Sequence, residues 1–192
     1  MKLCALRIGS TLNFTDLATN CGISVATAKS WLTLLEASFI LFLLPSYHEN
    51  LGKRITKSPK LFFYDVGLAA QIMGVDKDTI LKKRELYGGL FENMVIVDLI
   101  KNLHAQGIHN TLTFFRDSNQ NEIDLIVEAQ GKTIPIEIKS YETINSSYFD
   151  TLEWFVKETD NKNTPVVVYG GDRKQDRSQG RVIPWDRLEK IV

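Results

Sequence analysis

The sequence predicts an α/β (α+β) protein in two parts: a mainly helical N-terminal part, then a mixed sheet flanked by helices. Three observations support this fold class. Capping residues near the start separate short helical segments, a long apolar helix is predicted over 86–105, and short β-type runs follow it. At 192 residues, 44% hydrophobic and 24% charged, the chain can form one sizeable core or a small and a medium domain.

The N-terminal part has the outline of a helix-turn-helix. Its first residues, Met1–Leu6, form an apolar helical turn with no capping residue in front, so we expect a further domain upstream. Thr15 is expected to cap a short helix over 16–20, and Ser24 to cap an apolar second helix. Cys21–Ile23 provides the turn between them.

Two β-type stretches, Phe39–Leu44 and Leu61–Tyr64, follow the second helix. The polar loop that joins them is basic, and its basic residues are Lys53, Arg54, Lys57 and Lys60. Two helices followed by a β-ribbon with a basic loop are typical of a winged helix. We therefore predict a winged-helix domain over residues 1–74.

This predicted domain has two interpretations. Its second helix carries Lys29 as its only base, beside Glu36 and several apolar residues, which favours a role in packing between domains or subunits. DNA contact is the alternative, with the four basic residues of the wing as the phosphate-binding set.

The second part is predicted as a mixed α/β domain over residues 86–192, after a polar connector over 75–85. Its first helix, over 86–105, has apolar residues around much of its circumference, so we expect it to be packed on more than one side. The pattern further downstream predicts strands at 111–115, 122–128, 132–139, 166–169 and 181–184, a loop over 170–180, and helices at 148–158 and 185–191.

A predicted hairpin places charged residues together. If Gln130–Gly131 is a two-residue turn, Asp124 faces Glu137 and Glu122 faces Lys139. Since residues two apart on a strand point the same way, Asp124, Glu137 and Lys139 share one side. We expect a charged face on that side of the hairpin and an apolar face on the other.

Directly opposed carboxylates on antiparallel strands lie ~4.5–5.5 Å apart at Cβ and repel each other unless a cation lies between them. Mg²⁺ or Mn²⁺ is the natural candidate for Asp124 and Glu137, because hard divalent ions prefer oxygen ligands. The alternative is an ordinary solvated sheet face, on which Lys139 and Glu122 serve as ion-pair partners.

Glu92 lies on an apolar side of the predicted long helix, because Val95 and Ile96 follow it at helical spacing. A buried carboxylate without a partner costs several kcal/mol, so Glu92 needs one. Two hypotheses remain: Glu92 completes a metal pocket with the hairpin, or it forms a structural ion pair with Lys139 or Arg116.

These residues resemble a known superfamily. The order of Glu92 on a helix, Asp124 on a strand and Ile136-Glu137-Ile138-Lys139 on the next strand is similar to the PD-(D/E)xK (restriction-endonuclease-like) phosphodiesterases. More narrowly, the series Lys60–Leu68, Gly89–Asn93, Phe114–Arg116, Glu122–Asp124 and Glu137–Lys139 resembles an uncharacterised domain that follows an AAA-type ATPase domain in bacterial and archaeal proteins.

The resemblance implies roles for the residues. Asp124 and Glu137 would bind magnesium, Glu92 would support the site directly or through water, and Lys139 would orient or activate the attacking water. A lysine beside carboxylates keeps its proton more firmly, which favours positioning over general-base catalysis for Lys139. Arg116 is expected to contact a phosphate or, alternatively, to pair with a neighbouring carboxylate, Asp117 or Glu122.

The composition limits partners and location. With 23 basic and 23 acidic residues the formal net charge is zero, so attraction to DNA must come from a local patch. Neither the two cysteines nor the three histidines have zinc-site spacing, and we expect no disulfide and no structural zinc. The longest apolar run, 37–44, is far short of the ~20 residues that span a bilayer, and there is no signal-peptide pattern, so we predict a cytoplasmic protein without membrane contact.

The chain has no predicted ATP site of its own. Gly131–Thr133 is superficially similar to part of a P-loop, but Ile126 stands where the first glycine belongs and the triplet lies in a hairpin. ATP is therefore expected only through an N-terminal ATPase domain that this chain lacks, which would also be its partner. Self-association into a homo-oligomer is left open.

Two functions follow. The leading hypothesis is a magnesium-dependent phosphodiesterase-like domain that acts on DNA in an ATPase-linked protein. The alternative is a non-catalytic regulatory or protein-interaction module that retains the nuclease fold. The four positions Glu92, Asp124, Glu137 and Lys139 favour the first, and the zero net charge favours the second.

Overall fold

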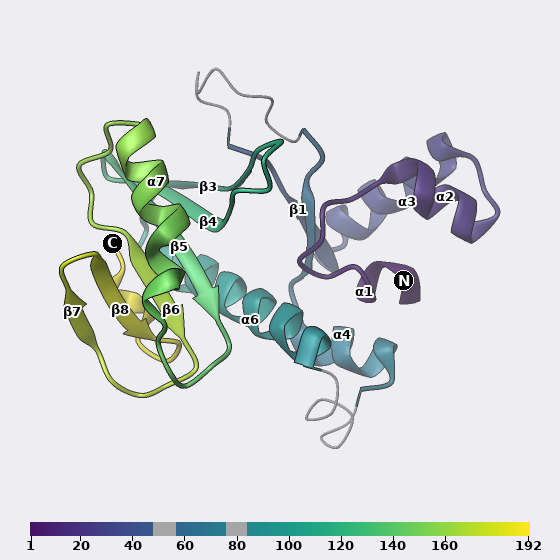
Figure 1. Ribbon diagram of the computed structural model, residues 1–192. Coiled ribbons are helices and arrows are strands. Elements are labelled where there is room, and N and C mark those ends of the chain that lie inside the picture. Colours follow the sequence, from purple (N-terminus) through teal and green to yellow (C-terminus); the bar gives the residue numbers. More distant parts are fainter. Residues whose placement is uncertain (48–56, 76–83) are drawn as a thin grey trace. The chain divides into compact units, whose positions relative to one another are not determined.

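The computed structural model describes residues 1–47, 57–75 and 84–192, which form two compact units (Figure 1). Unit 1 comprises Met1–Pro45 and Ser58–Asn93. Unit 2 is built on Met94–Val192, together with residues 46, 47 and 57. The long helix α6, Arg84–Ala105, contributes to both units, whereas the predicted division assigned it wholly to the second domain. Most of the predicted connector, residues 76–83, lies outside the described part of the chain.

Unit 1 starts with three helices, and the second and third begin at a side-chain cap. They are α1 (Lys2–Ala5), α2 (Phe14–Cys21) and α3 (Val25–Ala37). Ser24 caps α3 as predicted, since its hydroxyl accepts a hydrogen bond from the backbone N–H of Thr27. The predicted cap of α2 is wrong by two residues. Asn13, not Thr15, accepts the hydrogen bonds of the first turn.

A two-stranded ribbon and a further helix complete unit 1. Strands β1 (Leu41–Leu44) and β2 (Lys60–Phe63) pair antiparallel, close to the two predicted stretches. Lys60 belongs to β2 rather than to the loop in which it was predicted. Helix α4 (Val66–Met73) was not predicted, although Asp65 caps it and Gly74 ends it in a left-handed conformation.

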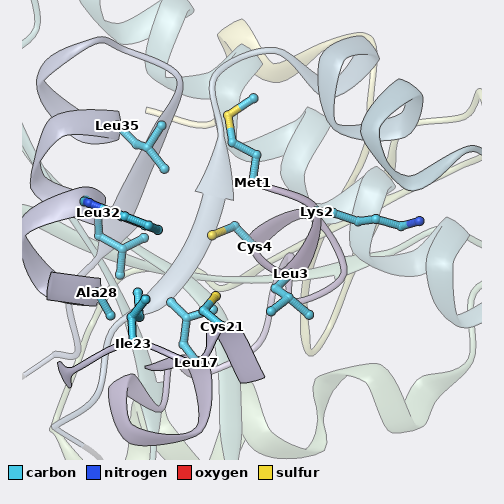
Figure 2. A pocket seen from close by; sticks show the side chains of 11 residues that line it. Met1, Lys2, Leu3, Cys4, Leu17, Cys21, Ile23, Ala28, Leu32 and Leu35 are labelled. Carbon is cyan, nitrogen blue, oxygen red and sulfur yellow. The ribbon is translucent and has the colours of Figure 1, made fainter. Parts of the chain in front are cut away.

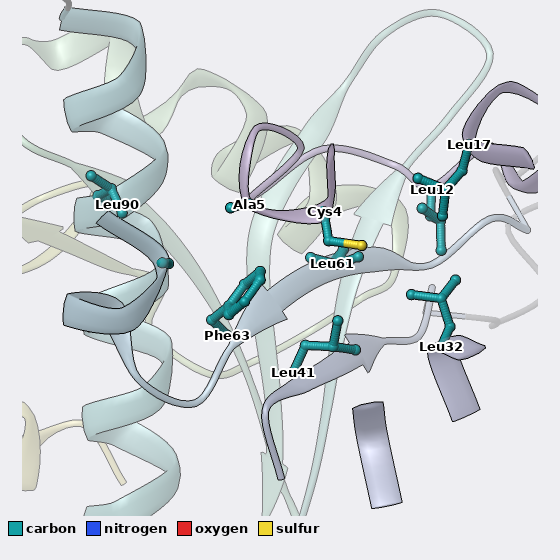
Figure 3. Close-up of a cluster of buried hydrophobic side chains, with 10 residues drawn as sticks. Cys4, Ala5, Leu12, Leu17, Leu32, Leu41, Leu61, Phe63 and Leu90 are labelled. Atoms are coloured by element: carbon teal, nitrogen blue, oxygen red, sulfur yellow. The ribbon is translucent and has the colours of Figure 1, made fainter. Parts of the chain in front are cut away.

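The core of unit 1 surrounds β2, all four residues of which are buried. Figure 3 shows side chains from the helices, the ribbon and the start of α6 meeting there; those labelled are Cys4, Ala5, Leu12, Leu17, Leu32, Leu41, Leu61, Phe63 and Leu90. The segment after α1 runs along β2, because Ile8 and Thr11 bridge to Leu61 and Lys60. Strand β2 is therefore enclosed by chain from several parts of the sequence.

Unit 2 contains a six-stranded mixed sheet in the order β3-β4-β5-β6-β8-β7, which confirms the predicted mixed α/β character. Strands β3, β4 and β5 are antiparallel neighbours, β5, β6 and β8 run parallel, and β7 is antiparallel to β8. The strands are β3 (Asn110–Arg116), β4 (Glu122–Ala129), β5 (Lys132–Lys139), β6 (Val166–Tyr169), β7 (Gln175–Arg177) and β8 (Gly180–Pro184).

Two predictions at the C-terminal end are wrong. Strand β7 lies inside the stretch predicted as a loop, because its polar residues carry no hydrophobic alternation and pairing with β8 alone makes it a strand. The helix predicted over 185–191 is only the single 3₁₀ turn η2, Leu188–Lys190.

One face of the sheet is covered by the 3₁₀ turn η1 (Ser146–Phe149) and helix α7 (Asp150–Glu158) (Figure 1). Aromatic residues fill this core, and the ring of Phe155 packs edge-on against Phe115 and Tyr47. All four residues of β6 are buried, so both faces of the sheet are covered at its centre. Among the residues that the structure describes, no helix is both long and apolar enough to cross a membrane.

Candidate functional site

The hairpin of β4 and β5 forms as predicted. Gln130 and Gly131 both have positive φ, 53° and 73°, as a two-residue type I′ turn requires. The ladder runs from the pair Ala129–Lys132 at the turn to the pair Leu125–Ile136. This register is the predicted one, and it places Asp124 and Glu137 one step beyond the last ladder pair.

Three charged side chains meet at this end of the hairpin, and we refer to Asp124, Glu137 and Lys139 as the acid–lysine cluster. The Lys139 ammonium contacts a carboxylate oxygen of Glu137 and lies 3.9 Å from Oδ2 of Asp124. The same Oδ2 accepts a hydrogen bond from the backbone N–H of Ile138 at 2.8 Å. A cation thus lies against both carboxylates, and it belongs to the protein itself.

Asp124, Glu137 and Lys139 share one side of the hairpin as predicted, but this side is not the solvated face considered as the alternative. Glu137 and Lys139 are side by side with Val167 and Tyr169 of β6, both of which belong to the core under α7. The side chains of Asp124, Glu137 and Lys139 are 14%, 13% and 29% exposed. These side chains are mostly covered because β5 lies inside the sheet, between β4 and β6. The sequence of the hairpin alone does not predict that position.

Lys139 is the last residue of β5, so the cluster lies where the chain leaves the sheet. Its ammonium lies 5.8 Å from the ring centre of Tyr148, a cation–π arrangement. Strands β6 and β8 run parallel to β5, and in open α/β sheets ligands commonly bind at the carboxyl ends of such strands. The geometry therefore presents a partly accessible ammonium between two mostly buried carboxylates.

Glu92 has a partner that sequence analysis did not foresee. Its carboxylate forms an ion pair with the ammonium of Lys60 at 3.0 Å, within unit 1. The side chain of Lys60 is 2% exposed and that of Glu92 15%. The next helix residue, Asn93, exchanges two hydrogen bonds with the backbone of Phe63, at 2.7 and 2.8 Å. Helix α6 thus holds both ends of β2.

Gly9 lies close against the carboxylate of Glu92 in this ion pair. It has φ +72°, and its N–H donates to the carbonyl of Leu61. A Cβ at this position would lie 2.8 Å from Oε2 of Glu92, so only glycine fits without a shift. Sequence analysis missed Gly9 because nothing local marks its approach to a residue far along the chain.

Most of unit 2 and the end of unit 1 match a known family model. The model described as "Domain of unknown function (DUF4143)" matches residues 87–188, more than half of the chain. The chain belongs to the DUF4143 family. A second model, "Domain of unknown function (DUF8612)", matches residues 1–79. The acid–lysine cluster and Glu92 lie within the DUF4143 region, whereas Lys60 and Gly9 lie within the DUF8612 region.

Two relatives of this DUF4143 chain are uncharacterised mycobacterial proteins, one from Mycobacterium bovis and one from Mycobacterium tuberculosis. Each is 29% identical to it over 135 residues, which covers 70% of this chain. The matched region spans only 30% of the length of each relative.

Arg116 of the DUF4143 region pairs with Glu122 at 3.4 Å, one of the two partners foreseen for it. The other, Asp117, is buried and organises the turn between β3 and β4. Its carboxylate accepts hydrogen bonds from the backbone of Asn119 and from the backbone and side chain of Asn121. Sequence analysis gave Asp117 no such role, although an aspartate two residues before an asparagine-rich turn is a signal for one.

The predicted phosphate-binding set of the wing is only partly described. Lys53 and Arg54 lie outside the described residues, and Lys57 is exposed. Lys60 is buried against Glu92, which does not suit contact with a phosphate. Lys29, the single base of α3, lies over the ring of Phe14 at 5.2 Å.

The metal-binding hypothesis rests on two carboxylates that the structure brings together, Asp124 and Glu137. Within residues 1–47, 57–75 and 84–192, no group of three or more His, Cys, Asp or Glu side chains is placed to hold a metal ion. Glu92, the third predicted ligand, belongs to unit 1.

Unit 1 contains a mostly apolar cavity of about 270 Å³ between α1, α2 and α3 (Figure 2). Lys2 contributes the one charged side chain of its lining. Cys4 and Cys21 both line it as free thiols, and burial raises the pKa of the Cys4 thiol, which keeps that thiol protonated at neutral pH. This cavity offers apolar packing rather than acid–base chemistry.

Proposed function

We propose that this DUF4143 chain carries a magnesium-dependent phosphodiesterase site of the PD-(D/E)xK type that acts on DNA. One observation carries the proposal: the hairpin register brings Asp124, Glu137 and Lys139 together at the carboxyl end of β5. Mostly buried carboxylates beside a lysine are common at catalytic sites, whereas charged residues that only keep a protein soluble are exposed.

The donor set suits a hard divalent ion. Asp124 and Glu137 supply carboxylate oxygens, which Mg²⁺ and Mn²⁺ prefer, and Mg²⁺ commonly keeps several waters besides one or two carboxylates. When bound, such an ion lowers the pKa of a coordinated water and stabilises charge on a phosphate. The backbone N–H of Ile138 holds Asp124 in place. Lys139, 29% exposed on a flexible stem, orients the water or contacts the phosphate.

Glu92 is not needed for this proposal. Its ion pair with Lys60 and the adjoining hydrogen bonds of Asn93 support a structural role in unit 1. The predicted supporting role of Glu92 in metal binding stays a prediction. Arg116, although paired with Glu122, remains partly exposed at the end of β3 and is a candidate for phosphate contact.

The wider setting is also proposed. The winged helix proposed over residues 1–74 would contact DNA through Lys53, Arg54 and Lys57. An N-terminal ATPase domain would accompany the chain in a cytoplasmic protein. The matched region covers only 30% of each mycobacterial relative, so those two proteins have length for further domains.

Cleavage assays on single-stranded, duplex and branched DNA with Mg²⁺ or Mn²⁺ test the proposal. We expect Asp124→Asn and Lys139→Ala each to lower the cleavage rate about 100-fold or more, because each removes a charge from the reacting centre. Lys132→Ala is the matched control, since Lys132 is an exposed lysine at the opposite end of the same strand. Equal rates for wild type and both site variants would refute the catalytic role.

A non-catalytic interaction module is the second candidate, and one observation favours it. The Lys139 ammonium lies against both carboxylates and reduces their mutual repulsion, so the cluster has a cation of its own in the place proposed for a metal. Calorimetric titration with Mn²⁺ separates the two functions. The phosphodiesterase requires binding that Glu137→Gln weakens, whereas the module requires none.

A further inference from the structure

We propose that a hollow beside the acid–lysine cluster, between Tyr141 and Tyr148, receives an unpaired base next to the scissile phosphate. The preferred substrate would then be single-stranded or locally unpaired DNA. This inference rests on the proposed function, because it assigns the phosphate to Lys139 and specifies the neighbouring nucleotide.

The hollow is formed by the segment that joins β5 to α7. Figure 1 shows the course of this connection. The hollow has a volume of about 470 Å³ and is formed by residues 141–146 and Tyr148. Lys139 precedes this segment by two residues, and its ammonium lies 5.8 Å from the ring centre of Tyr148. A strand with a phosphate at Lys139 would therefore place an adjoining base beside that ring.

Both ends of the segment are held by hydrogen bonds. The N–H of Gly170, after β6, donates to the carbonyls of Lys139 and Tyr141 at 3.1 and 3.0 Å. A Cβ at Gly170 would lie 2.6 Å from the carbonyl oxygen of Ser140, so glycine permits this approach. Asn145 accepts a hydrogen bond from the N–H of Ser147 and starts η1. The hollow is thus preformed, which reduces the entropy lost on binding.

The lining suits a base. Tyr141 is 51% exposed, whereas Tyr148 is partly buried and packs on the core together with Ile144. Aromatic faces bind unpaired bases by stacking, and every base has such a face. In a duplex the bases are already stacked inside the helix and would have to be flipped out, at a cost of a few kcal/mol.

The charge of the hollow favours a base over a phosphate. Among residues 141–146 and Tyr148, Glu142 is the one charged side chain, and it is negative. A phosphate would be repelled there, but the neutral edge of a base would find the hydroxyl of Thr143 and the amide of Asn145. Binding energy in the hollow should therefore depend weakly on salt, unlike the contact of Lys139 with phosphate.

Fluorescence anisotropy tests this inference, with a short labelled single-stranded DNA and without divalent metal, so that no cleavage occurs. We expect Tyr141→Ala to weaken binding by about 5- to 100-fold through loss of stacking. Tyr141→Phe should retain the affinity, and the salt dependence of the remaining binding should be unchanged. Trp185→Ala is the control, because Trp185 is another exposed aromatic residue of unit 2 and is not part of the lining.

Two outcomes would overturn the inference: wild-type affinity in Tyr141→Ala, or no binding of single-stranded DNA by the wild type. Neither outcome decides the proposed function, which is judged by cleavage and by Lys139→Ala. Conversely, tyrosine-dependent binding without any cleavage would support the hollow and refute the phosphodiesterase. A fully paired duplex should bind more weakly than the single strand, and equal affinity would also count against the hollow.

Discussion

Two lysine–carboxylate groups in this protein have the same chemical composition but different surroundings. In unit 1, Lys60 and Glu92 form an ion pair with the lysine 2% exposed and Gly9 close against the carboxylate. In unit 2, Lys139 is 29% exposed and contacts two carboxylates at the end of a strand. The lysine of the first group is almost fully buried. The second group brings two carboxylates to one lysine, which is more exposed.

The two ion-pair groups also differ in how well they suit the proposed phosphodiesterase chemistry. The ion pair of Lys60 and Glu92 joins β2 to α6 and is mostly buried. Two carboxylates beside one ammonium repel each other, so their proximity is retained at a cost in stability, as is common at functional sites. The ion pair of Glu92 with Lys60 agrees in kind with the structural alternative considered for Glu92, although its partner is Lys60 rather than Lys139 or Arg116.

The largest expected effect on stability is seen when one glutamate of each lysine–carboxylate group is replaced by glutamine. Glu92→Gln should lower the free energy of unfolding by about 3 kcal/mol, since it leaves the buried ammonium of Lys60 without that charge partner. Glu137→Gln should change it by less than about 1 kcal/mol, because Asp124 still faces Lys139 and the carboxylate repulsion is relieved. Urea denaturation measures both. Equal losses would remove the distinction between the groups.

The next effect concerns the hydrogen bonds beside the ion pair of Lys60 and Glu92. Asn93→Leu should lower the free energy of unfolding by about 2–4 kcal/mol, because the N–H and C=O of Phe63 lose their buried partner. Asn102→Leu on the same helix is the control, since its amide contacts only the carbonyl of Asp98 among the bonds described and is partly exposed. A small loss in Asn93→Leu would show that α6 does not hold β2 in this way.

A smaller effect is expected from Gly9→Ala, which should cost about 2 kcal/mol in thermal or urea unfolding. Part of the loss is the strain of alanine at φ +72°, and part is the approach of its Cβ to Glu92. Gly22→Ala separates the two causes, because Gly22 has φ +67° and no atom within 4 Å of a Cβ. If both variants lose the same stability, the approach to Glu92 does not add to the loss.

The smallest effect lies in the turn that sets the register of the acid–lysine cluster. Gln130→Asn should raise the free energy of unfolding by about 0.5 kcal/mol, because asparagine tolerates the left-handed conformation of a type I′ turn. Gln130→Val should lower it, since a β-branched side chain is strained there. Cleavage by Gln130→Asn should equal that of the wild type, and a change in rate would mean that the turn affects more than stability.

Much of the fold could be predicted from local sequence patterns. Ser24 caps its helix, and β5 and β6 have the predicted bounds, because capping and short apolar β-type runs depend on neighbouring residues. The elements that were not predicted, β7 and α4, are stabilised by contacts with other segments of the chain. Strand β7 is polar and exists through its pairing with β8, and α4 is a short helix packed against α1.

The sequence by itself determined the register of the β4–β5 hairpin, and with it the meeting of Asp124, Glu137 and Lys139. A two-residue turn and the alternation of strand side chains are local geometry, so the pairing follows from residue numbers. Only the tertiary structure decided that Glu92 pairs with Lys60, 32 residues away, and that the charged side of the hairpin is covered. Charge and spacing define which partners a carboxylate accepts, but packing between distant segments decides which one it meets.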